Sequence, residues 1–255
     1  MAKEKNKSDE MSFLDHLEEL RWHLIRSIAS ILVFAILAFI FYNIIFDYII
    51  LAPKTPDFIT NRLLCQLGEK VGSAKLCINS QPFQIINIKM AGQFATHIMV
   101  SVIAGVIIAF PYIFYEFWRF VEPALYEKEK NSARGSVFYT SFLFLIGVLF
   151  GFYVITPLSV HFLGTYHVSE QVENTINLGS YINTVTSVVL ASGVIFELPI
   201  FILFLSKAGL VSPEFLRKYR RHSLVIILLL SALITPPDIF SQVLVSLPLL
   251  ILYEV

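Results

Sequence analysis

The sequence predicts an all-α polytopic membrane protein with six transmembrane helices, the last two short, and with its N- and C-termini cytoplasmic. Three observations support this fold class. Of the 255 residues, 56% are hydrophobic and 15% are charged, whereas about a quarter of the residues in soluble domains are charged. Charged residues divide the chain into six apolar blocks. Fourteen of the nineteen Lys and Arg residues lie in the amino-terminal segment and in loops around 115–134 and 207–221, which the positive-inside rule assigns to the cytoplasm.

Residues 1–255 form a single membrane domain in this interpretation. An amphipathic helix over 12–26 leads into the first span, which ends before Asp47. An external loop covers 47–89, and the second block follows it. A cytoplasmic loop covers 115–134. The third block then runs to about Pro157, and the fourth runs from about Leu178 to Ser206.

A short helical hairpin over 222–255 completes the chain. Its two apolar blocks hold sixteen and fifteen residues. At 1.5 Å per residue each would span about 24 Å, less than the roughly 30 Å hydrocarbon core. Either the hairpin stops short of the far surface or the bilayer is thinner around it.

The external loop contains the two cysteines of the chain, Cys65 and Cys77. This loop would lie in an oxidising compartment of a bacterium, where a disulfide can form. The sequence leaves open whether these residues form a disulfide or remain two free thiols.

The amino-terminal helix carries three acids, Asp15, Glu18 and Glu19, that lie off its apolar stripe. A solvated helix on the membrane surface is one reading. However, an anionic leaflet attracts bases rather than acids. An acidic patch there therefore favours binding of something cationic.

Acids and aromatic rings alternate in the segment 114–134. The acids are Glu116, Glu122, Glu127 and Glu129. An interfacial aromatic belt explains most of the rings, but it explains the acids less well. Carboxylates beside aromatic faces can hold guanidinium groups by bidentate hydrogen bonds and by stacking.

Glu197 is the only charged residue between Glu173 and Lys207. An ionisable group in the bilayer costs roughly 2.5–3.5 kcal/mol or more, so it usually faces a polar cavity, a partner or a transport path. A protonated Glu that seals a helix contact is the alternative. Pro199, two residues later, should kink the span beside this acid.

The turn before the last block contains further polar candidates. Asp238 can cap the sixth helix, while Thr235 and Gln242 offer hydrogen bonds to a transmembrane helix of another protein.

Four motifs resemble the TatC family, the multispanning receptor and core subunit of the twin-arginine protein translocase. They are HLEELR at 16–21, the FxxPALYxxE spacing from Phe120 to Glu129, GVIFELP at 193–199 and TPPDIFSQ at 235–242. The resemblance covers essentially the whole chain. The family pattern usually has a basic residue where this chain has His23, and an uncharged residue where it has Glu122.

The resemblance implies that the cytoplasmic amino-terminal helix and first loop bind the paired arginines of signal peptides on folded precursors. By motif, the binding acids are Glu19 and Glu129, with Arg21 and Phe120 beside them. Glu197 then helps to receive the signal peptide or single-span TatA/TatB-type partner subunits.

The resulting prediction is a non-enzymatic translocase subunit of the bacterial inner (plasma) membrane. It would act as a homo-oligomer within a larger complex, driven by the proton-motive force, in contact with lipids but not with nucleic acid, and without cofactor, metal or catalytic residue. The alternative is a proton-coupled small-solute transporter that uses Glu197. That fold would contain inverted repeats, yet the first half has no second Pro-interrupted acidic span.

Overall fold

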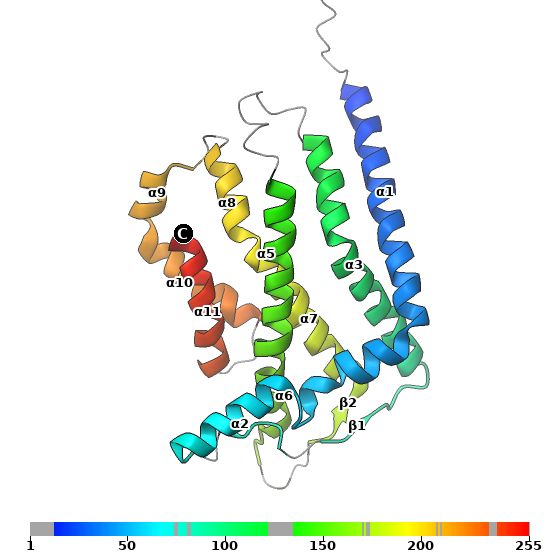
Figure 1. Ribbon diagram of the computed structural model, residues 1–255, viewed down its shortest axis with the longest axis vertical. Coiled ribbons are helices and arrows are strands. Elements are labelled where there is room, and N and C mark those ends of the chain that lie inside the picture. Colours follow the sequence, from blue (N-terminus) through cyan, green and yellow to red (C-terminus); the bar gives the residue numbers. More distant parts are fainter. Residues whose placement is uncertain are drawn as a thin grey trace, which may run out of the picture.

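The structure is a computed structural model that describes residues 13–73, 76–80, 83–121, 135–169, 171, 174–207, 209, 211–234 and 239–254. The segment that contains Glu122 and Glu129 and the turn that contains Thr235 and Asp238 lie outside these residues. The described part is mostly helical (Figure 1).

Four helical segments in the described part are long and apolar enough to cross a membrane: Leu17–Ile40, Gly92–Val121, Ser136–Thr165 and Leu178–Ser206. The chain is therefore a membrane protein. The corresponding elements are α1 (Phe13–Ile40), α3 (Gly92–Val121), α5 (Ser136–Phe150), the π-helical η5 (Gly151–Ile155), α6 (Thr156–Thr165), α7 (Leu178–Phe196) and α8 (Leu198–Lys207).

Three further helices follow: α9 (Pro213–Lys218), α10 (Arg220–Ile234) and α11 (Ile239–Glu254). α10 has 15 residues and α11 has 16, so each is about 22–24 Å long. The short hairpin is present, but neither helix reaches the length of a full span. A total of six spans therefore stays a prediction.

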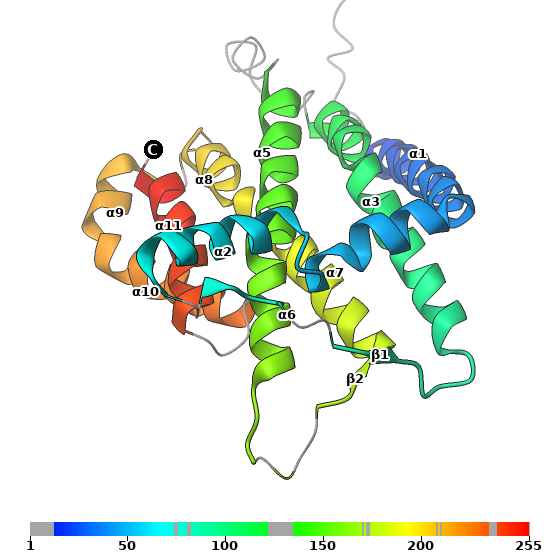
Figure 2. The ribbon, with the colours of Figure 1, turned by 60° about the horizontal axis from the view of Figure 1, so that its bottom comes forward.

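The bundle has two distinct ends (Figure 1). At the N-terminal end α1 begins, α3 ends, α5 begins and α8 ends. The opposite end, which we call the cap end, carries η1 (Ile44–Ile50), η2 (Ala52–Lys54), α2 (Ile59–Val71), β1 (Ile85–Ile86) and β2 (Ile176–Asn177). The two strands pair in parallel, with Ile85 opposite Ile176. α2 runs across this end rather than along the spans (Figures 1 and 2).

Two helices continue past the boundaries predicted from the sequence. The first seven residues of the predicted loop over 115–134 are helical, because α3 continues to Val121. Trp118 holds this last turn, since it is buried and its ring lies 5.3 Å from that of Phe204 in α8. The helical segment of the third block continues past Pro157 to Thr165, because a proline is tolerated in the first turn of α6.

Pro157 also creates the link between α2 and the third span. Since Pro157 has no N–H, the Tyr153 carbonyl loses its usual α-helical donor. The Thr60 hydroxyl of α2 donates to this carbonyl instead. Phe58, which precedes α2, is buried and stacks on the Tyr153 ring at a centroid distance of 5.5 Å.

Buried amides and a disulfide hold the rest of the cap end together. The Asn61 amide donates to the carbonyls of Pro53 at 3.0 Å and Thr55 at 2.7 Å. The Asn79 amide reaches the carbonyls of Pro53 and Pro157 at 3.2 and 3.1 Å. A disulfide joins Cys65 and Cys77. The segment expected to be an external loop is thus an ordered layer fixed to the third span.

The membrane core depends on close helix contacts. One buried cluster joins η1, α3, α5 and α7, and a second joins α7 to α10 and α11. The rings of Phe110 in α3 and Phe144 in α5 stack at 3.6 Å. α1 packs against α3 through Gly105, where an added Cβ would lie 2.8 Å from the Ile31 carbonyl oxygen and the Ala35 nitrogen.

We predict that Gly105→Val lowers the free energy of unfolding by about 1–3 kcal/mol, because the new side chain meets α1 backbone that cannot move aside. Ala104→Val is the matched control, since Ala104 borders an apolar cavity of about 330 Å³. Thermal denaturation in detergent compares the two variants. Equal melting temperatures for both would contradict the tight α1–α3 contact.

Candidate functional site

A buried carboxylate links α1 to α3 near the N-terminal end. Glu116 of α3 is only 2% exposed. Its Oε2 lies 2.5 Å from Nδ1 of His23 and 3.7 Å from Nη1 of Arg26, both in α1. The Tyr112 hydroxyl, one turn earlier in α3, donates to Oε1 at 2.8 Å. Both carboxylate oxygens therefore have partners within the chain.

This cluster fixes how α1 sits on α3. Burying an unpaired carboxylate costs several kcal/mol, so the contact with His23 is strongly favoured once Glu116 is buried. His23 is itself buried. In the sequence, Glu116 is one of several interleaved acids, and His23 stands out as a departure from the family pattern. That departure was the available signal, because a residue that replaces a usual base can pair with an acid elsewhere.

Two of the expected binding residues flank this cluster. Glu19 lies one turn before His23 in α1, and Phe120 lies one turn after Glu116 in α3. The Phe120 ring is half-buried and meets the His23 ring edge-on at 6.1 Å. Arg21 is exposed. Glu129, the second expected acid, is outside the described residues.

Glu19 and Glu116 differ in what surrounds them. Glu116 is enclosed by groups of its own chain, so it has no capacity for a guest. Glu19 is partly exposed, and it makes no hydrogen bond or ion pair within the part of the chain that the structure describes. Of these two acids, Glu19 is therefore the one that an external cation can reach.

Glu197 lies at a break between α7 and α8. Its N–H donates to the Val194 carbonyl at 3.1 Å, and its own carbonyl accepts from the Phe201 N–H at 3.0 Å. The side chain is half-buried and lies against the backbone of Phe144 in α5. The predicted kink beside Pro199 is thus present as a break in the helix.

Unpartnered polar atoms occur at this break and on the helix beside it. Oε1 of Glu197 is buried and has no hydrogen-bond partner among the described residues. The same is true of the hydroxyls of Thr140 and Ser141 in α5, one turn before Phe144. Groups of this kind in lipid favour binding of a polar group from outside the chain.

Gln242 has less hydrogen-bonding capacity for a partner helix than the sequence suggests. Its side-chain amide donates to the Leu228 carbonyl of α10 at 3.2 Å, so one donor is used inside the hairpin. The side chain is half-buried, which leaves part of the amide for another contact. Thr235 and Asp238 lie outside the described residues.

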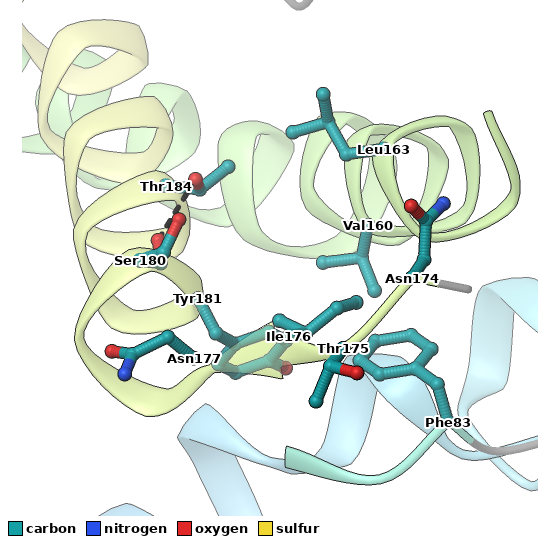
Figure 3. Close-up of a pocket in the computed structure, with 10 residues that line it drawn as sticks. All are labelled: Phe83, Val160, Leu163, Asn174, Thr175, Ile176, Asn177, Ser180, Tyr181 and Thr184. Carbon is teal, nitrogen blue, oxygen red and sulfur yellow. Dashed lines mark hydrogen bonds between the residues drawn. The ribbon is translucent and has the colours of Figure 1, made fainter. Parts of the chain in front are cut away.

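A pocket of about 370 Å³ at the cap end was not predicted (Figure 3). Phe83, Tyr181 and residues of β2 line it. Its polar side chains are largely occupied by backbone groups: the Asn174 amide donates to the Tyr166 carbonyl at 2.8 Å, and Asn177 caps α7 by accepting from the Gly179 N–H. The Tyr181 and Thr184 hydroxyls likewise donate to backbone carbonyls, so most polar side chains of the pocket are used within the chain. No set of three metal-binding side chains occurs among the described residues.

Comparisons with known proteins agree with this architecture. Residues 15–248 match the family described as "Sec-independent protein translocase protein (TatC)". The protein of that name from Blattabacterium sp. subsp. Periplaneta americana (strain BPLAN) is 42% identical over 252 residues, covering 98% of this chain and 95% of the relative. The one from Desulforapulum autotrophicum is 35% identical over 255 residues, covering 100% and 85%.

Two solved structures are also similar. Both are crystal structures of "Twin Arginine Translocase Receptor- TatC", one of them in DDM. They superpose with TM-scores of 0.65 and 0.70 at 33% identity, and the matches cover 94% of this chain and 95% and 96% of the solved chains. Because the fold, the family match and the relatives agree, we conclude that the chain belongs to the TatC family of Sec-independent protein translocase proteins.

Proposed function

We propose that this chain is the receptor and core subunit of a twin-arginine translocase, with its N-terminal end in the cytoplasm of a bacterial cell. The observation that carries the proposal is the geometry of Glu19. Among the described residues this acid has no hydrogen-bond or ion-pair partner, and the buried His23–Glu116 contact holds its helix next to Phe120.

Paired arginines suit such a site. A guanidinium group can form two parallel hydrogen bonds with one carboxylate, and it can stack on an aromatic face. Glu19 and Glu129 supply one carboxylate each in this proposal, while Phe120 offers the ring. Arg21, exposed on the same helix, completes the set of residues that we assign to this site by motif.

The break at Glu197 serves a second step in the proposal. Its unpartnered Oε1 and the neighbouring α5 hydroxyls receive a polar group of the signal peptide or of single-span TatA/TatB-type subunits. Gln242, with Thr235 and Asp238, extends this contact on the hairpin. The proton-motive force, worth about 2.3 kcal/mol per charge per 100 mV, drives export by the homo-oligomeric complex in the inner membrane.

We predict that Glu19→Ala and Glu129→Ala each weaken capture of a twin-arginine signal peptide by about tenfold or more, because a charge-assisted hydrogen bond is lost. Glu→Asp at either position should weaken capture less, because the carboxylate is kept. Glu18→Ala, at an exposed acid beside Glu19, is the matched control. Crosslinking of a twin-arginine peptide measures capture. If both alanine variants crosslink as well as the parent, the site is elsewhere.

His23→Ala should lower the free energy of unfolding by about 3 kcal/mol, since it removes the closest partner of a buried carboxylate. It should also weaken peptide capture, because the α1–α3 contact that positions Glu19 is loosened. Glu116→Gln keeps a hydrogen-bond acceptor and adds a donor, so it should lower the free energy of unfolding less than His23→Ala does. Arg21→Ala, on the exposed face of α1, should leave stability unchanged.

A double-mutant cycle between His23 and Glu116 separates their contact from unrelated effects. We expect a coupling energy above about 1 kcal/mol, as found for residues in one buried network. Strictly additive losses would show that the two residues stabilise the chain independently.

A photocrosslinker at Glu197 should capture a single-span partner subunit, whereas one at Ile36, exposed on α1, should not. Glu197→Leu should weaken the association, since a polar partner then meets an apolar side chain. Co-purification from membranes gives the readout. Proton-coupled solute uptake by proteoliposomes that contain this chain alone would instead support the transporter alternative.

A further inference from the structure

α2 at the cap end has three faces with different surroundings. One face is packed on the protein through the buried Asn61 and Gly68. A second, polar face carries Arg62, Gln66 and Glu69, all exposed. The third carries a stripe at four-residue intervals in which every side chain is apolar and 52–74% exposed. This stripe comprises Ile59, Leu63, Leu67 and Val71.

The stripe is not part of a membrane span. α2 has 13 residues and lies outside the four span-length segments of the described chain. Its one-sided arrangement of apolar side chains over three turns is typical of a helix that lies in the plane of a membrane surface. The stripe differs from scattered exposed apolar residues, because its members form one continuous surface.

The contacts that attach α2 to the third span determine its depth in the membrane. The Thr60 hydroxyl donates to the Tyr153 carbonyl, and Phe58 stacks on the Tyr153 ring. Tyr153 follows the start of its span, Ser136, by 17 residues, or about 26 Å along a helix. The hydrocarbon core is roughly 30 Å thick. With Ser136 at one boundary of this core, the first turn of α2 lies at the other boundary, where acyl chains meet headgroups.

The direction of α2 fits this depth. The helix runs across the cap end instead of along the spans, and it extends below the α10–α11 hairpin in the view of Figure 1. The Cys65–Cys77 disulfide and the Asn61 hydrogen bonds fix it in that orientation.

We propose that α2 is an interfacial helix that inserts its apolar stripe into the lipid surface at the cap end. Acyl chains near the headgroups cover Leu63 and Leu67, and the face of Arg62, Gln66 and Glu69 remains in water. Lys70, which lies beside the stripe on the helix, extends its ammonium group to lipid phosphates. A second copy of this chain could cover the same stripe, and the experiment separates the two cases.

Tryptophan quenching tests the proposal. Leu67→Trp and Gln66→Trp are made in the full chain with its disulfide intact, and each protein is placed as a single copy in a nanodisc of phosphatidylglycerol and phosphatidylcholine with brominated acyl chains. The parent signal, from the two native tryptophans, is subtracted. Leu63→Trp serves as a second probe if Leu67→Trp does not fold.

The added tryptophan at Leu67 should emit at short wavelength and lose about half or more of its intensity to the bromines, as expected for a side chain in the headgroup–acyl boundary. The tryptophan at Gln66 should emit as in water and stay unquenched. Unquenched emission at both Leu67 and Leu63 overturns the proposal. If their emission shifts to short wavelength only when a disc holds two copies, the stripe is instead an interface between copies.

Discussion

The buried carboxylate of Glu116 is the constraint on which the N-terminal end depends. It is buried between two helices, so it must be satisfied by polar groups of the chain itself. His23, Arg26 and Tyr112 do this from both helices. The result is one defined rotation of α1 on α3. Glu19, one helical turn before His23, is thereby held at a fixed place, and it has no ion-pair partner in the part of the chain that the structure describes.

Glu197, in the middle of the bundle, differs from Glu116 in its hydrogen bonding. Glu116 has its partners inside the chain, whereas Oε1 of Glu197 and two hydroxyls of α5 have none among the described residues. Glu197 lies at the break between α7 and α8, inside a segment long enough to span the membrane. In our proposal, this unpartnered oxygen of Glu197 receives a polar group of the signal peptide or of a partner subunit.

The sequence predicted a helical membrane protein with four long apolar helices, a short hairpin and a break near Glu197, because apolar length and proline have local effects. It did not predict the His23–Glu116 contact, which joins residues 93 positions apart and requires knowledge of helix packing. It also did not predict that the helix continues past Pro157, since the donor that satisfies the Tyr153 carbonyl comes from Thr60, far away in the sequence.

The most direct test of the central claim asks whether the environment of Glu19 distinguishes arginine from lysine. A photocrosslinker at position 20, beside Glu19, is compared in native membranes with a precursor that carries twin arginines and with one that carries twin lysines. Bidentate binding predicts strong crosslinking to the arginine precursor and little to the lysine precursor, although both carry the same charge. Equal crosslinking to the two precursors, or none to either, would contradict the account.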